Sequence, residues 1–292
     1  MPCTIVGPGA MGCLWASLQK QPCHFLAKDG HPFLQTDHFE YLPAATQVNF
    51  SASTFNEYRN TGDHLIIATK AYAAKDALQR ALQSVKNPSS IFLLQNGMGS
   101  QQEIAALYPH LPIFAVSSTH GAFKPDPLTL MHAGMGTQRI GPLTASAELS
   151  IVEELLPPGS FSWYLDIENV LWQKLQINSA INALTVIYQC ANGELLDGGE
   201  RQQHMAKLCA ETDLLLQTSG INHQPSLALA EQVAKLTAKN FSSMYQDVAH
   251  HRKTEIKYIN GYIVDKCREY SLLCPTHQAL LQQAEKWAVN PS

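Results

Sequence analysis

The stretch CTIVGPGAMGCLWASL, residues 3–18, decides the fold of the first half of the chain. It predicts a short β-branched strand, a glycine-rich turn and an apolar helix. The turn has the pattern G-x-G-x-x-G, in the strand–turn–helix context that a dinucleotide site requires: Gly7, Pro8, Gly9, Ala10, Met11 and Gly12. Gly7 permits a tight turn, Gly9 lets a pyrophosphate approach the backbone, and Gly12 lets the helix pack closely on the strand. The diphosphate would lie on free N–H groups at the positive end of the helix. A glycine turn that binds nothing is the weaker alternative.

The second strand is expected over residues 24–28, and its last residue should contact the adenosine ribose. NAD sites usually place Asp or Glu there, whereas this chain has Lys28 followed by Asp29. A cation suits a 2′-phosphate, so we predict NADP as the cofactor and assign Lys28 to that phosphate. The alternative is an ordinary surface lysine.

Three further strands are expected to deliver polar or small residues at their carboxyl ends, where open α/β sheets bind ligands. The strand 64–69 ends in Lys70 and precedes a helix over 71–85; the strand 90–94 is followed by Asn96-Gly97; the strand 113–117 ends near Ala122. Alone, Lys70 would be a surface lysine and Asn96-Gly97 an ordinary turn. Their shared position at strand ends favours the ligand-binding interpretation.

The remaining chain divides into a part with strand-like patterns and a part with helical patterns. Residues 32–62 predict an irregular strand or two, and residues 139–141 and 161–164 predict closing strands, antiparallel at a sheet edge. After Asp166 strand-like runs cease and helical patterns follow. We therefore expect a dinucleotide-binding domain over residues 1–166 and an all-helical domain over residues 167–292.

The helical half opens with WQKLQINSAIN, residues 172–182. Lys174, Asn178 and Asn182 recur every fourth residue, which places them within about 80° of arc on one helix face. A cation and two amides on a core-forming helix need partners, because unpaired buried polar groups are costly. We interpret them as one wall of a polar pocket; a solvated stripe is the alternative.

Later helices are expected over 204–218, 227–241 and 275–289. Thr254 is expected to cap another helix, with Glu255 in its first turn, where the helix dipole favours a carboxylate.

Composition excludes several classes of function. Of 292 residues, 45% are hydrophobic and 15% charged, and the net charge is −4, which argues against nucleic acid or an anionic membrane as the principal partner. We find no membrane-spanning run and no signal sequence. Seven scattered cysteines fit reduced thiols, so a cytoplasmic location is expected. Twelve histidines form no HExxH pattern, and we predict no metal. His250-His251 is interpreted as an exposed helix face.

The constellation of glycine loop, Lys70, Asn96-Gly97 and Lys174 with its asparagines resembles the ketopantoate reductase family. The C-terminal half strengthens the resemblance with three further segments: Ser242-Ser243-Met244-Tyr245-Gln246-Asp247, Lys253-Thr254-Glu255-Ile256 and Ile259-Asn260-Gly261. It covers the whole chain, and its C-terminal motifs are far more specific than the glycine loop.

The resemblance implies a Rossmann-type domain followed by an all-α domain like the C-terminal helical domain of 6-phosphogluconate dehydrogenase, with NADPH and substrate between them. Lys174 matches the proton donor, and Asn96 matches the residue that touches nicotinamide and substrate. The substrate-binding positions match Asn178, Asn182, Asn192 and Ser243. Positions at or near the cofactor match Lys70, Ala122 and Glu255. Two departures are Lys257, where the family has an acidic residue, and a short segment before Lys28.

The implied activity is NADPH-dependent reduction of 2-dehydropantoate to (R)-pantoate, in pantothenate and coenzyme A biosynthesis. A lysine ammonium can stabilise the charge that forms on the carbonyl oxygen and donate a proton to it. A reductase of another branched 2-oxo acid and a non-catalytic NADP-binding regulator are the alternatives. We expect a monomer or homodimer with a small-molecule 2-oxo acid as its partner.

Overall fold

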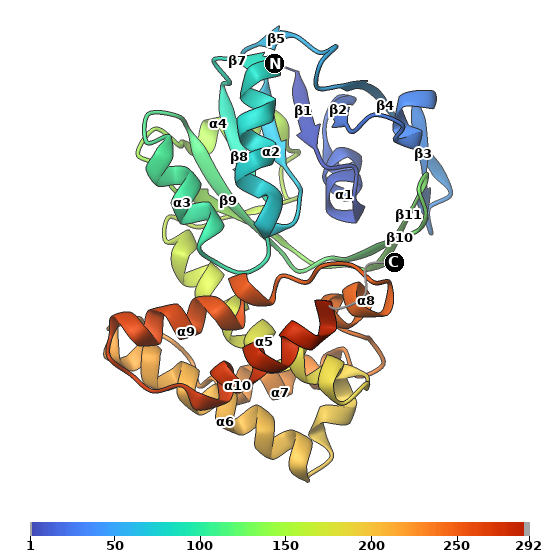
Figure 1. Cartoon of the computed structure of the whole chain (residues 1–292). Coiled ribbons are helices and arrows are strands. Elements are labelled where there is room, and N and C mark those ends of the chain that lie inside the picture. Colours follow the sequence, from blue (N-terminus) through green and yellow to red (C-terminus); the bar gives the residue numbers. More distant parts are fainter. Residues whose placement is uncertain (1, 289–292) are drawn as a thin grey trace. The chain divides into compact units, whose positions relative to one another are not determined.

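The computed structural model describes residues 2–288 and divides the chain into two compact units (Figure 1). The first unit runs up to Gln95 and continues over Ser100–Ile167. The second contains the chain from Glu168 onward together with the short segment Asn96–Gly99. The main division thus lies one residue after the predicted one. No local pattern predicts that Asn96–Gly99 belongs with the helical unit.

A mixed sheet is the framework of the first unit. Within residues 2–288 it has eleven strands in the order β10-β11-β3-β4-β2-β1-β6-β8-β9-β12-β13. Their bounds are β1 Cys3–Val6, β2 Cys23–Ala27, β3 His38–Leu42, β4 Thr46–Thr54, β6 His64–Ile67, β8 Ser90–Leu93, β9 Ile113–Ser118, β10 Gly121–Asp126, β11 Thr129–Gly134, β12 Gln138–Pro142 and β13 Ser162–Trp163. The strands from β4 to β9 pair in parallel, while β5 (Asn60–Thr61) and β7 (Val85–Lys86) form a separate pair.

Helices cover both faces of the parallel strands, as a buried parallel sheet requires. They are α1 (Ala10–Leu18), α2 (Ala71–Ser84), α3 (Ser100–Leu107) and α4 (Leu149–Leu155), with a 3-10 turn η1 at Pro32–Gln35. Successive strand residues alternate between two apolar clusters: Ile5 packs with α1 and α4, and Val6 packs with α2 and α3. The predicted combination of a Rossmann-type domain and an all-helical domain is confirmed.

The sheet edges differ from the prediction. β12 pairs antiparallel with β9, as expected, but β13 pairs parallel with β12. The expectation of an antiparallel edge was wrong for β13 because the connection through α4 returns the chain in the original direction, as a parallel pair requires. The β10–β11 hairpin was not predicted. Its Pro125 is tolerated because β10 is an edge strand.

The hairpin reaches back to the start of the chain. β11 pairs in parallel with β3, and both β10 and β11 pack against α1 (Figure 1). The glycine-rich turn therefore has neighbours more than 100 residues away in the sequence.

The second unit is helical throughout its described part. Its elements are α5 Ile167–Ile187, η2 Asn192–Leu196, α6 Glu200–Thr218, α7 Ser226–Leu236, α8 Ser243–Ala249, η3 Ile256–Tyr258, α9 Asn260–Glu269, α10 Pro275–Ala284 and η4 Glu285–Ala288. α7 ends earlier than predicted, where Thr237 Oγ1 donates to Val233 O at 2.7 Å. Thr254 caps no helix, because the chain makes the single turn η3, with Glu255 at its N-cap, before α9. The end of the predicted helix 275–289 lies outside the described residues.

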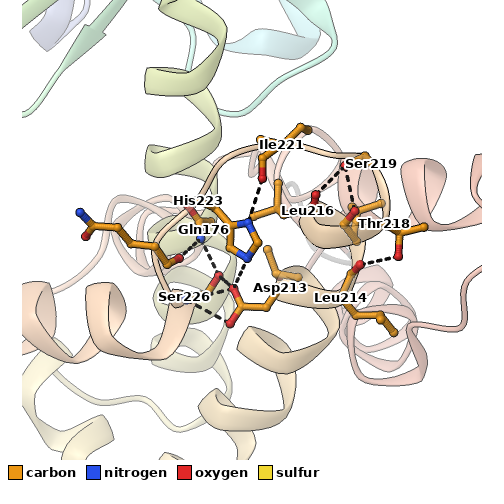
Figure 2. Close-up of polar contacts among 12 residues, drawn as sticks. Gln176, Asp213, Leu214, Leu216, Thr218, Ser219, Ile221, His223 and Ser226 are labelled. Carbon is orange, nitrogen blue, oxygen red and sulfur yellow. Dashed lines mark hydrogen bonds and ion pairs between the residues drawn. The ribbon is translucent and has the colours of Figure 1, made fainter.

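Polar contacts join α5 to the connection between α6 and α7 (Figure 2). Asp213 on α6 accepts hydrogen bonds from the backbone N–H of Ser226 at 3.0 and 3.2 Å and from its hydroxyl. Gln176 on α5 donates to Ser226 Oγ at 2.8 Å and to Gln224 O at 2.9 Å. His223 Nδ1 instead contacts Ile221 O. Since Ser226 donates to the carboxylate rather than to His223, this group is a helix cap and not a catalytic triad.

A second polar network joins α5, α9 and α10 around fully buried His277. Asn260 Nδ2 donates to Ser179 O at 2.9 Å and to His277 Nδ1 at 3.1 Å. Because Nδ1 accepts, Nε2 carries the proton and donates to Leu208 O at 3.1 Å. Burial lowers the pKa of His277 from 6.5 to about 4. Asn260, one residue of the family motif, is therefore a structural link between three helices.

His277 makes the stability of the protein pH-dependent. Between pH 6.5 and 4 the unfolded chain binds a proton at this residue while the folded chain does not. We expect the free energy of unfolding to fall as pH falls through this window, by up to about 1.4 kcal/mol per pH unit from His277 alone. Urea unfolding at pH 7, 6 and 5 measures this slope. His277→Gln should flatten it, exposed His250→Gln should not, and equal slopes for all three proteins would contradict the prediction.

Candidate active site

The glycine-rich turn of the first unit has the features of a diphosphate cradle. Gly7 has a φ of +104°, which favours glycine, and a Cβ on Gly12 would lie 2.2 Å from Gly7 O. A Cβ on Gly9, in contrast, would have no neighbour within 4 Å. Gly9 is the N-cap of α1, where no side chain caps the helix and its first turn carries no acidic residue. Gly12 thus serves packing, while Gly9 leaves open space beside uncapped N–H groups that fit a phosphate.

The other predicted cofactor residues of this unit lie at the ends of neighbouring strands. Lys70 follows β6 and is the N-cap of α2. Gln95 supports this turn, because its Nε2 donates to Ile67 O at 2.6 Å and to Thr69 O at 3.3 Å. Ala122 packs with Ala10 against the same apolar cluster. Lys28 follows β2 and is exposed. The structure thus packs β10, the strand that carries Ala122, against α1 and leaves Lys28 exposed.

A chain of three polar side chains fixes the loop that leads to Ala122, and sequence reasoning missed it. Tyr41 on β3 hydrogen-bonds to His132 Nδ1 at 2.6 Å, and His132 Nε2 hydrogen-bonds to His120 Nδ1 at 2.9 Å. Gly136 N donates to His120 Nδ1 at 3.1 Å, so that nitrogen is an acceptor and His132 Nε2 donates to it. Burial lowers the pKa of His120. No local sequence pattern indicated these contacts, because they depend on the unpredicted hairpin.

In the second unit the predicted polar row lies on α5. Lys174 and Asn178 are half-buried, and Asn182 is 7% exposed. Gln176 lies about 160–200° around the helix from Lys174 and Asn178, and its contacts hold that opposite face. Within residues 2–288, the side-chain amides of Asn178 and Asn182 have no hydrogen-bond partner. The burial of Asn182 contradicts a solvated stripe and favours a binding wall.

Asn192 on η2 contributes a further unsatisfied group. Its backbone N–H donates to Asn240 O at 2.9 Å, and its Nδ2 donates to Thr237 Oγ1 at 2.9 Å. The Oδ1 atom is buried and has no donor among the described residues. A buried acceptor in this state fits a hydroxyl donor from a ligand.

Two neighbouring serines have different roles. The buried Ser242 shares a 2.7 Å hydrogen bond with Thr185 of α5 and accepts from Tyr245 N at 3.0 Å, which caps α8. Ser243, the predicted substrate contact, is exposed at the first position of α8. Sequence reasoning missed the positioning role of Ser242 and Thr185. A serine directly before the first helical residue is the local signal for such a cap.

The segment containing Asn96 contacts the segment containing Glu255 within the second unit. Met98 N donates to Tyr258 O at 2.8 Å, and a Cβ on Gly97 would lie 2.2 Å from that oxygen. Tyr258 N donates in turn to Glu255 O at 2.9 Å, and Glu255 is 4% exposed. The structure thus places the half-buried Asn96 beside the Glu255 turn. Lys257 is exposed, so its departure from the family pattern changes the charge of a surface position.

Two kinds of feature are absent from the described residues, 2–288. No group of three His, Cys, Asp or Glu there has an arrangement that holds a metal ion. No helix in this part of the chain has the length and apolar character needed to span a membrane.

Comparison with known proteins gives concordant matches. The family model described as ketopantoate reductase PanE/ApbA matches residues 3–145, and its C-terminal counterpart matches residues 166–287. The 2-dehydropantoate 2-reductase of Vibrio cholerae serotype O1 is 33% identical over 294 residues, covering 97% of this chain and 96% of that protein.

Two solved structures show the same fold. D-mandelate dehydrogenase with NADH and anilino(oxo)acetate has a TM-score of 0.87 at 22% identity, covering 99% of this chain and 98% of that one. A dimeric ketopantoate reductase from Staphylococcus aureus has a TM-score of 0.80 at 19% identity, covering 99% of both chains.

Two glycine-to-alanine variants separate packing from ligand access in the turn. Gly12→Ala forces a methyl group against Gly7 O and should destabilise the fold, on the order of 3 kcal/mol. Gly9→Ala meets no neighbour, so its melting temperature should equal that of the wild type. Its dissociation constant for a dinucleotide should nevertheless rise about tenfold or more, since the methyl group occupies the approach of the phosphate. Thermal melts and fluorescence titration measure the two effects. Unchanged affinity in Gly9→Ala would exclude this turn as the diphosphate site.

Proposed function

Because the chain belongs to the ketopantoate reductase PanE/ApbA family, we propose that it reduces 2-dehydropantoate to (R)-pantoate with NADPH. The observation that carries the proposal is the α5 row: Lys174, Asn178 and Asn182 share one face of a helix that is otherwise mostly buried. This arrangement offers one proton donor beside amides that have no partner among the described residues.

Lys174 is the proposed acid. The bound nicotinamide supplies the hydride that converts the 2-oxo carbon to an alcohol carbon. As negative charge develops on the carbonyl oxygen, the Lys174 ammonium stabilises it and then donates a proton. A lysine suits this role because one group provides both the charge and the proton.

The amides hold the substrate in register with that acid. Asn178 and Asn182 lie one and two helical turns along α5 from Lys174, so a substrate contacting all three extends along the helix. Asn192 Oδ1 needs a donor, and a substrate hydroxyl is one. Amides supply both donors and acceptors without a net charge, which suits a substrate with hydroxyl and carboxylate groups. Asn96 and Ser243 are proposed as further contacts.

NADPH rather than NADH is proposed because the residue directly after β2 is a lysine, Lys28, and not the carboxylate that usually binds the ribose hydroxyls in NAD sites. The glycine-rich turn, Lys70, Ala122 and Glu255 are the other proposed contacts of the cofactor. The structurally similar D-mandelate dehydrogenase was solved with NADH, so the preference needs a direct comparison in this protein.

The decisive experiment follows the absorbance of NADPH, and separately of NADH, with purified protein and 2-dehydropantoate. Faster oxidation of NADPH supports the reaction and the cofactor, whereas equal rates retain the reaction and exclude the preference. Turnover of another branched 2-oxo acid but not of 2-dehydropantoate would replace the substrate. Tight NADPH binding without turnover of any 2-oxo acid would favour a regulator.

Replacing the proposed acid should slow the chemical step. Lys174→Ala should lower kcat by about 10²–10⁴, the usual effect of losing a general acid. Its dissociation constant for NADPH should change far less. The exposed Lys235→Ala, in the last turn of α7, is the control and should leave kcat unchanged. A wild-type kcat in Lys174→Ala would remove this residue from the mechanism.

Replacing an amide should weaken substrate binding instead. Asn182→Ala should raise KM more than it lowers kcat, because the amide holds substrate and transition state alike. Exposed Asn222→Ala provides the matched control. If KM stays unchanged while the melting temperature falls, Asn182 serves packing and not the substrate.

A further inference from the structure

Lys124, on the unpredicted strand β10, reaches the glycine-rich turn. Its ammonium donates a hydrogen bond to Pro8 O at 2.9 Å. The same nitrogen lies 4.4 Å from the centre of the Phe33 ring, within the range of a cation–π contact. Pro8 belongs to the loop after β1, and Phe33 belongs to η1, which follows β2. Lys124 therefore lies between the segments that follow the first two strands.

The ammonium of Lys124 forms no ion pair within the described part of the chain, and the charge of Asp126 acts on it only from a greater distance. No carboxylate there comes within 4.0 Å of its ammonium. Asp126, two residues away, accepts a hydrogen bond from Leu128 N at 2.8 Å. The Cys13 thiol lies 3.8 Å from the ammonium, and burial raises its pKa to about 11, so it is neutral at pH 7. Only a carbonyl dipole and an aromatic face offset the charge at contact distance.

Partial burial of the Lys124 ammonium is energetically costly and favours the binding of an anion beside it. Loss of solvent lowers the pKa of Lys124, because a partly buried ammonium is poorly hydrated. Burial, followed by the charge of Lys124, lowers the pKa of the nearby His31. This side of the turn therefore holds a poorly hydrated positive charge with no anion at contact distance. A phosphate group would relieve both the desolvation and the missing charge.

The position of the ammonium selects which phosphate. In a Rossmann domain the pyrophosphate lies at the N-terminus of the first helix, whereas the adenosine ribose lies near the end of β2. Lys124 contacts both the loop before α1 and η1, which follows β2, and the second of these contacts lies on the side of the ribose. We propose that Lys124 recognises the 2′-phosphate of NADPH and is the main determinant of the cofactor preference. This inference rests on the proposed cofactor but not on the proposed substrate.

The test compares two ligands that differ by one phosphate. Dissociation constants for 2′,5′-ADP and for 5′-AMP are measured by calorimetry, without any 2-oxo acid. The wild type should prefer 2′,5′-ADP, and Lys124→Gln should lower that preference about 10- to 100-fold while leaving 5′-AMP within twofold. Glutamine removes the charge and retains an N–H donor on a side chain one bond shorter, and Lys124→Met, which removes both, is the matched comparison. Lys124→Arg should retain the preference, and Lys28→Gln should retain most of it. The folding of each variant is checked by its melting temperature.

Three outcomes would overturn the proposal. Equal loss of both ligands in Lys124→Gln would mean that Lys124 only shapes the loop through Pro8. Loss of the preference in Lys28→Gln alone would assign the phosphate to Lys28. Absence of any preference in the wild type would exclude a 2′-phosphate site. Failure of the proposed substrate is separate, because a chain that does not turn over 2-dehydropantoate can still show the expected loss.

Discussion

The second unit depends on one constraint: α5 must be buried and still present polar groups on one face. Gln176 and Ser179 meet this constraint from elsewhere on the helix, through Ser226 and Asn260. Each of these contacts uses a polar group that would be costly to bury alone. They set the rotation of α5, and the rotation decides where Lys174 points. The buried Asn260–His277 network thus belongs to the function indirectly, since the direction of the proposed acid follows from it.

Local signals explain what the sequence predicted well. The spacing of the glycines predicts where a side chain cannot fit in the turn, and the structure agrees for one of them: Gly12 has no room for a Cβ, whereas Gly9 has room for one. The parallel strands are apolar runs because helices cover both faces. The i, i+4 spacing of the α5 row needs only the geometry of a helix. In each case the residues that decide the structure lie within about twenty positions of one another.

Contacts between residues far apart in the sequence explain what the sequence-based prediction missed. Lys124 meets Pro8 across 116 residues, and Tyr41 meets His132 across 91. Both depend on the β10–β11 hairpin, which was not predicted and whose Pro125 is compatible with a strand only at the edge of a sheet. The roles of Ser242 and Ser243 were also hard to separate. Two adjacent serines are chemically identical, and only the start of α8 decides which one caps the helix and which one is exposed.

The exposure of a lysine also determines how strongly it can distinguish NADPH from NADH. An exposed lysine such as Lys28 attracts a phosphate through water and salt, which screen the interaction. A half-buried ammonium that forms no ion pair keeps more of its field, and it has already lost part of its hydration in the folded protein. A 2′-phosphate that meets such a group replaces missing water and missing charge together. NADH, with a hydroxyl in that place, replaces neither. If Lys124 binds the 2′-phosphate as proposed, discrimination between the cofactors depends less on the number of lysines near the ribose than on how much solvent each has lost.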